Sequence, residues 1–232
     1  MEFLLLVEDR RDEAPRAAVG VEEMGKFALQ LAEQGVLRDA AGPLRPEAEG
    51  ARVRVRGGAA VVTDGPFAEG REVVGGYFVV EVPDRAAAIE LAKRCPYARA
   101  GVIEVRVMQC GPRGEGSGGQ RFMLLYLWGP EPPGSDDPRC AEMRHFTEQL
   151  ARQGKVTGGG RLPTEIPPAQ VEIRGARTIV TDGPFAETKE IIAGFALIEA
   201  ADRAEAIEIA KRVPHARWDT VVVREVGRMG AP

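Results

Sequence analysis

The sequence has little of the residue types that mark several protein classes. Its three cysteines, Cys95, Cys110 and Cys140, are irregularly spaced, so neither a disulfide framework nor a cysteine-based zinc site is expected. No cluster of Lys and Arg stands out and the net charge is −4, which argues against nucleic acid or a membrane as partner. The apolar run at residues 3–7 is too short for a signal peptide or a membrane span. We therefore expect a cytoplasmic protein.

Motifs for metals and cofactors are also missing. Two histidines and three scattered cysteines offer no ligand cluster with zinc spacing. The glycines at 158–160 lack both a following Gly-Lys-Ser/Thr and the strand-to-helix context of a nucleotide site. The sequence thus predicts no metal and no cofactor.

An internal repeat is the strongest signal that is present. Residues 62–69 and 180–187 both read Val-Thr-Asp-Gly-Pro-Phe-Ala-Glu. Aligning 62–99 with 180–217 gives 23 identities in 38 positions, where unrelated chains would share about two or three. Two copies are too few for a solenoid, so the repeat indicates a duplicated domain.

The boundary between the copies falls in a glycine-rich stretch without apolar periodicity. We predict a first domain at 1–109, a flexible linker at 110–120 and a second domain at 121–232.

Each copy predicts the same order of elements, which is strand, helix, hairpin, long strand, helix and strand. In the first copy these are residues 3–7, 21–34, 53–63, 73–80, 84–94 and 102–107. This order is an elaborated ferredoxin-like βαββαβ plan of the α+β class.

The long strands 73–80 and 191–198 are apolar at both odd and even positions, so both faces of each should be covered. Helices cover one face, and the duplicate copy is expected to cover the other. Two sheets packed face to face would make a pseudo-twofold dimeric α+β barrel within one chain.

The repeated octapeptide resembles the signature of the YCII-related, or DGPF, domain family. The second copy, which continues Thr-Lys-Glu, matches fully, whereas the first departs at Gly70 and Arg71. The resemblance covers both copies and implies the same dimeric α+β barrel. The wider superfamily includes isomerase-like enzymes, a dehydrochlorinase, monooxygenases and domains associated with sigma factors, so it implies no single activity.

Asp64 and Asp182 are the candidate catalytic residues. Each precedes Gly-Pro at the mouth of a long strand, where a carboxylate could act as general base or bind a polar substrate. Asp, Gly and Pro are also residues that favour tight turns, so a purely structural loop is an equal alternative.

Further candidates for ligand binding surround these loops. Glu69 and Glu187 could share acid and base roles with the aspartates, or could form solvated ion pairs. Arg106 and Arg224 occupy matching places on the last strand of each copy and could bind an anion or neutralise a buried carboxylate. The remaining two candidates are aromatic and could be substrate platforms or plugs of the core; they are Phe67 and Phe185.

Histidine does not mark a site in both copies. His145 takes the place of Lys26, and His215 the place of Tyr97. Each is expected to lie at the surface. Some enzymes of the wider superfamily use a His and an Asp in the cavity, but neither copy has a histidine that the other matches, so at best one copy could be active, through His145.

Two functions from different classes follow. The first is a small-molecule-binding barrel, such as a cofactor-independent isomerase or lyase. The alternative is a non-catalytic interaction or regulatory module. The expected partner is a small molecule, and the chain is expected to be a monomer with an internal pseudo-dimer or a homodimer.

Overall fold

The computed structural model describes residues 1–10, 18–67, 72–134, 136–183 and 190–227. The first copy contains β1 (Glu2–Arg10), α1 (Val21–Glu33), β2 (Leu37–Pro43), η1 (Glu47–Glu49), β3 (Ala51–Arg56), β4 (Ala59–Asp64), β5 (Glu72–Glu81), α2 (Arg85–Arg94), η2 (Pro96–Arg99) and β6 (Val102–Val107). The short strand β7 (Gln109–Cys110) lies between the copies. The second copy contains β8 (Gln120–Trp128), α3 (Pro138–Arg152), β9 (Val156–Arg161), β10 (Ala169–Arg174), β11 (Arg177–Asp182), β12 (Ile191–Ala200), α4 (Arg203–Arg212), α5 (His215–Trp218) and β13 (Thr220–Glu225). Among the helices of these residues, none has the length and apolar character needed to cross a membrane.

The strands form two antiparallel sheets, so the chain is of the α+β class. The six-stranded sheet has the order β11-β10-β6-β1-β5-β2, and the seven-stranded sheet has the order β4-β3-β13-β8-β12-β9-β7. Each sheet therefore combines strands from both copies.

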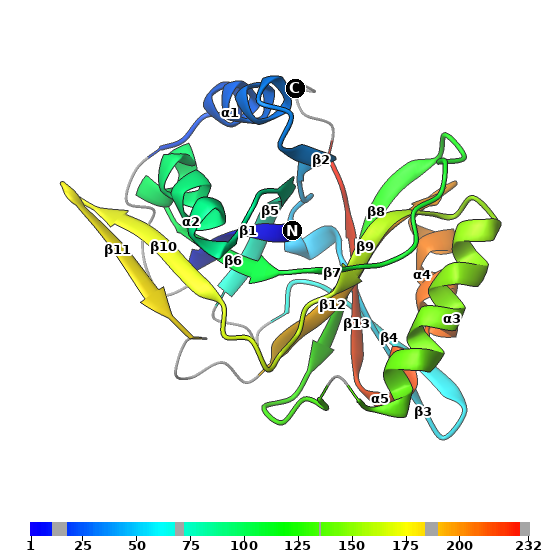
Figure 1. Ribbon diagram of the computed structural model, residues 1–232. Helices are drawn as coiled ribbons and strands as arrows, with labels where there is room; N and C mark the ends of the chain where they lie inside the picture. The colour runs from blue at the N-terminus through cyan, green and yellow to red at the C-terminus, as the bar shows by residue number, and fades with distance from the viewer. Residues whose placement is uncertain (11–17, 68–71, 135, 184–189, 228–232) are drawn as a thin grey trace.

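The hairpins are exchanged between the copies, which corrects the expectation that each hairpin belongs to its own copy's sheet. Strand β3 pairs with β13 of the second copy, and β10 pairs with β6 of the first. In Figure 1 the yellow β10–β11 arm lies beside β6, and the cyan β3–β4 arm lies beside β13. The Gly57-Gly58 turn of the first arm has positive φ at both residues, which this type of two-residue hairpin turn requires. The sequence periodicity predicts that each hairpin forms, but it does not predict which strand the hairpin pairs with.

Strands β2 and β9 were not predicted, because neither segment alternates apolar and polar residues. Strand β9 reads Val-Thr-Gly-Gly-Gly-Arg and pairs with β12. Its Gly159 has φ +124°, and a Cβ there would lie 2.4 Å from the Phe195 carbonyl oxygen. Only glycine allows β9 to approach β12 so closely.

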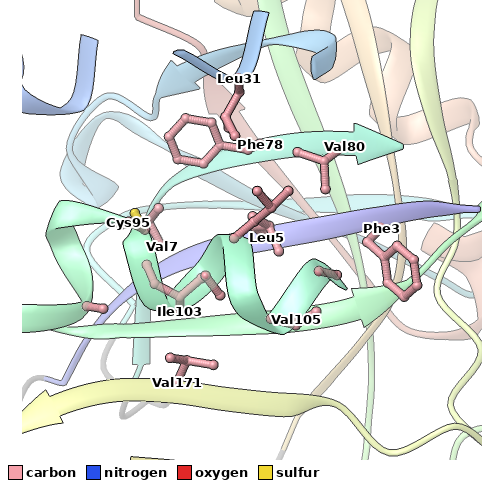
Figure 2. Close-up of a cluster of buried hydrophobic side chains, with 14 of the residues drawn as sticks. Phe3, Leu5, Val7, Leu31, Phe78, Val80, Cys95, Ile103, Val105 and Val171 are labelled. Atoms are coloured by element: carbon pink, nitrogen blue, oxygen red, sulfur yellow. The ribbon is translucent and has the colours of Figure 1, made fainter. Parts of the chain in front are cut away.

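Three apolar clusters hold the molecule together. Two lie between a sheet and its helices. Figure 2 shows the first of these, in which Phe78 and Val80 of β5 lie at one side and Val171 of the exchanged β10 lies at the other, beside Ile103 of β6. The third cluster joins the two sheets and takes Tyr77 and Val79 from the other face of β5. The prediction that the long strands are buried on both faces is thereby confirmed.

The segment expected to be a flexible linker is held along the second copy. Gly111 and Gly114 donate backbone hydrogen bonds to β9 and its neighbourhood, at Gly159 and Val156. Further along, Gly118 donates to the Glu199 carboxylate at 2.6 Å.

Candidate functional site

The two predicted catalytic aspartates lie where each exchanged arm ends. Asp64 ends β4 and pairs with Arg203 of α4, in the opposite copy. Asp182 ends β11 and pairs with Arg85 of α2, again in the opposite copy, at 2.6 Å. Both carboxylates are exposed, with side-chain accessibilities of 73% and 72%. Each pair attaches the base of an arm to the helix that the arm packs against.

The other predicted ligand-binding residues fall into two groups. Phe67 is buried in the cluster between the sheets, and the guanidinium of Arg52 lies 4.8 Å from its ring centroid. Glu69, Phe185 and Glu187 lie outside the described residues.

Arg106 and Arg224 are both buried, but their partners differ. Arg106 donates to the buried carboxylate of Glu104 at 3.1 Å and to the Ile192 carbonyl oxygen. Arg224 donates to the Arg45 carbonyl oxygen at 2.6 Å, and burial lowers its pKa. The matching positions thus provide one buried ion pair and one arginine on a backbone carbonyl.

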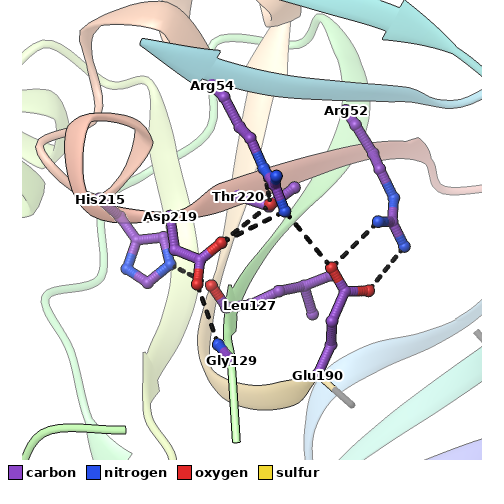
Figure 3. A network of polar contacts seen from close by, with 8 residues as sticks. All are labelled: Arg52, Arg54, Leu127, Gly129, Glu190, His215, Asp219 and Thr220. Atoms are coloured by element: carbon purple, nitrogen blue, oxygen red, sulfur yellow. Dashed lines mark hydrogen bonds and ion pairs between the residues drawn. The ribbon is translucent and has the colours of Figure 1, made fainter. Parts of the chain in front are cut away.

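A polar network joins the β3 arm to the second copy (Figure 3). Arg52 donates to both carboxylate oxygens of Glu190, at 3.0 and 2.8 Å. Arg54 lies 3.4 Å from Asp219, whose other carboxylate oxygen accepts a hydrogen bond from the Gly129 N–H. This network fixes the strand ends that surround His215.

His215 is buried, which corrects the expectation of a surface histidine. Pro214 and His215 begin the short helix α5, which packs the imidazole against Trp128, with ring centroids 4.8 Å apart. His215 Nε2 lies 2.7 Å from the Leu127 carbonyl oxygen. Burial lowers the pKa of His215 to about 4 although this hydrogen bond acts in the opposite direction, so the ring is neutral at neutral pH. His145 is exposed, as predicted.

A cavity of about 300 Å³ lies next to His215, between α3 and strands β8, β9 and β12. Its aromatic wall consists of Tyr126, Trp128, His215 and Trp218, whereas the Phe195 side chain belongs to the cluster between the sheets. Since an engineered cavity of about 150 Å³ holds benzene, this volume accommodates a single-ring compound with substituents.

The aromatic wall is held in place by an arginine. Arg139 lies over Trp128, with 4.8 Å between the guanidinium carbon and the ring centroid, and over Trp218 at 5.8 Å. Asp137 fixes this arginine through two hydrogen bonds, at 2.8 and 2.7 Å, and the same contacts lower the pKa of Asp137 to about 2. The two indole rings are parallel, at 5°.

The first copy has an aromatic residue at only one of the four corresponding positions. Val7 and Asp9 stand where the second copy has Tyr126 and Trp128, and Tyr97 replaces His215. The Tyr97 hydroxyl donates to the Asp9 carboxylate, so these two side chains satisfy each other.

Sequence reasoning missed this pocket because it searched for residues shared by both copies. A signal was available in the differences: both tryptophans of the chain lie in the second copy, at positions where the first has Asp9 and Ala100. Among the described residues, no group of His, Cys, Asp and Glu is placed to hold a metal ion.

Comparison with known proteins assigns the chain to a family. A model of the YCII-related domain matches residues 1–110 and, a second time, residues 123–230. The chain belongs to the YCII-related domain family. It carries two YCII-related domains in tandem, as the internal repeat predicts. An uncharacterized protein of Rhizobium meliloti (strain 1021) is 40% identical over 85 residues, which are 37% of this chain and 68% of that protein.

Proposed function

We propose that this tandem YCII-related protein binds a small, single-ring molecule in the aromatic pocket of its second copy. The observation that carries the proposal is the cavity of about 300 Å³ beneath α3, lined by both tryptophans of the chain. This volume is at the lower end of the range for small-molecule sites, and a mostly apolar wall with a few polar groups is typical of them.

The architecture around the pocket is proposed to be a pseudo-twofold α+β barrel of two ferredoxin-like units. The strand orders β6-β1-β5-β2 and β13-β8-β12-β9 support this assignment. Along the chain, each arm is inserted between the second and the third of these strands, that is, between β2 and β5 or between β9 and β12. The apolar cluster that joins the sheets fills the interior with side chains from both copies. The ligand is therefore assigned to the helix side of the second sheet.

Asp64 and Asp182 are proposed to hold the exchanged arms. Both are exposed and paired across the copies, and neither lines the aromatic pocket. This role corresponds to the structural alternative for the Asp-Gly-Pro loops.

Binding can be tested by calorimetric titration of the full chain with single-ring compounds, both neutral and acidic. The variant Trp218→Ala, which introduces the residue of the first copy, should weaken binding at least about tenfold because it removes one wall. Tyr97→Phe is the control, since it alters only the corresponding region of the first copy, and it should bind as the wild type does. Loss of binding in Tyr97→Phe, or equal binding in Trp218→Ala, would reject the proposed pocket.

A further inference from the structure

The charged side chains that line the pocket are all positive. Arg139, Arg144 and Arg161 line it, and none of the described lining residues is acidic. Arg139 is paired with Asp137 and Arg161 with Glu165, at 2.7 and 2.9 Å. Two of the three charges are therefore compensated.

Arg144 is the uncompensated charge. It is exposed on α3, and its guanidinium forms no hydrogen bond or ion pair within the part of the chain that the structure describes. A guanidinium presents paired N–H donors that match the two oxygens of a carboxylate. The rim of the aromatic pocket thus favours an anionic substituent on the ring that the pocket holds.

The inner wall offers a hydrogen-bond acceptor. A backbone carbonyl can only accept, so the contact of His215 Nε2 with the Leu127 oxygen places the proton on Nε2. Nδ1 then carries a lone pair on a ring that lines the pocket. Tyr126 lies beside this ring, with centroids 5.5 Å apart, and its hydroxyl is without a partner among the described residues. A ligand hydroxyl can donate to His215 and accept from Tyr126.

We infer that the pocket takes a hydroxylated single-ring carboxylic acid, with its ring against the tryptophans, its carboxylate at Arg144 and its hydroxyl toward His215. This inference rests on the proposed binding function and gives it a ligand class. The observation behind it is the placement of one uncompensated cation and one neutral imidazole around an aromatic cavity.

Tryptophan fluorescence offers a direct test, because the two tryptophans of the chain, Trp128 and Trp218, both line the pocket. The probes are 4-hydroxybenzoate and 4-hydroxybenzamide, which have the same shape and differ in charge. We expect the acid to bind at least about tenfold more tightly than the amide. Arg144→Gln should reduce this preference to less than about threefold.

Arg152→Gln is the matched control, since it removes the same charge from an exposed site of the same helix that does not line the pocket. It should keep the preference for the acid. Equal binding of acid and amide by the wild type, or an unchanged preference in Arg144→Gln, would overturn the ligand class and leave the binding function standing. Absence of binding by both probes and by neutral single-ring compounds would overturn both.

Discussion

Helices α1 and α3 occupy equivalent places in the two copies, yet α1 buries more of its side chains than α3 does. Three residues of α1, Phe27, Ala28 and Leu31, are buried, whereas Leu150 is the buried residue described for α3. Phe146, which corresponds to Phe27, is half-buried. The duplicated architecture thus provides a packed core under α1 and, beside the core under α3, a pocket lined by residues that differ from those of the first copy.

The inner faces of the two sheets have also diverged. The first copy has Glu8 and Glu104 facing the interior, where the second has Leu127 and Val222. Charged and apolar residues thus occupy equivalent positions between the two sheets. The exchanged arms pair with strands of the opposite copy in both halves although these buried positions differ.

The largest expected effect separates the two helices. Phe27→Ala removes a ring that is 3% exposed and packs edge-on against Phe78, so it should destabilise the protein by about 3–5 kcal/mol. Phe146→Ala removes a half-buried ring at the edge of the second copy's core and should cost about 1–2 kcal/mol. Denaturant unfolding measures both. Equal losses would contradict the difference in packing.

The second comparison concerns the buried arginines. Arg106→Met leaves the Glu104 carboxylate buried without its partner, and should cost about 3–5 kcal/mol of unfolding free energy. Arg224→Met removes a donor from the Arg45 carbonyl and should cost about 1–2 kcal/mol. The same unfolding experiment would contradict this account if Arg224→Met were the more damaging change.

The third prediction is a pH dependence that His215 of the second copy produces. Folding lowers the pKa of His215 from 6.5 to about 4, so the unfolded chain binds the proton more readily than the folded one. The contribution of His215 to the free energy of unfolding should be fully present above about pH 6.5. The free energy of unfolding should fall by up to about 3 kcal/mol as the pH drops to about 4. Asp219 and Arg139 are the charged groups acting on this ring, with opposite effects.

This pH effect can be assigned by NMR, because the chain has two histidines. In His145→Gln the remaining imidazole resonance should titrate near pH 4, and the protein should keep its loss of stability between pH 6.5 and 4. His215→Phe should reduce that loss. A His215 resonance that titrates near 6.5 would show that the ring is not buried as described.

The smallest effect is expected at the Asp-Gly-Pro loops. Asp64→Asn and Asp182→Asn each weaken an exposed ion pair, so each should cost less than about 1 kcal/mol and the two should be similar. Ligand binding by the aromatic pocket should not change. Loss of ligand binding in either variant would indicate that the Asp-Gly-Pro loops form part of the binding site.

The sequence predicted those parts of the fold that depend on local patterns. Apolar runs located β5 and β12, and Asp84 begins α2 by accepting a hydrogen bond from the Ala87 N–H, as expected of an N-cap. The exchange of the arms could not be predicted, because the residues of β3 carry the same alternation whichever strand they pair with.

The candidate site was harder to predict for a physical reason. The repeated octapeptide drew attention to Asp64 and Asp182, but repetition also results from a shared structural role. The pocket depends on residues that differ between the copies and converge only in space, such as Trp128 of β8 and Trp218 of α5. Their separation along the chain does not predict that these residues are close in space.

A crystal structure of the full chain grown with 4-hydroxybenzoate tests the central claim most directly. The account predicts electron density for the ring beside Trp128 and Trp218, with the carboxylate toward Arg144, and no density at the corresponding place under α1. Density under both helices, or at the loops that begin with Asp64 and Asp182 in place of the pocket, would contradict the claim that the second copy alone forms the site.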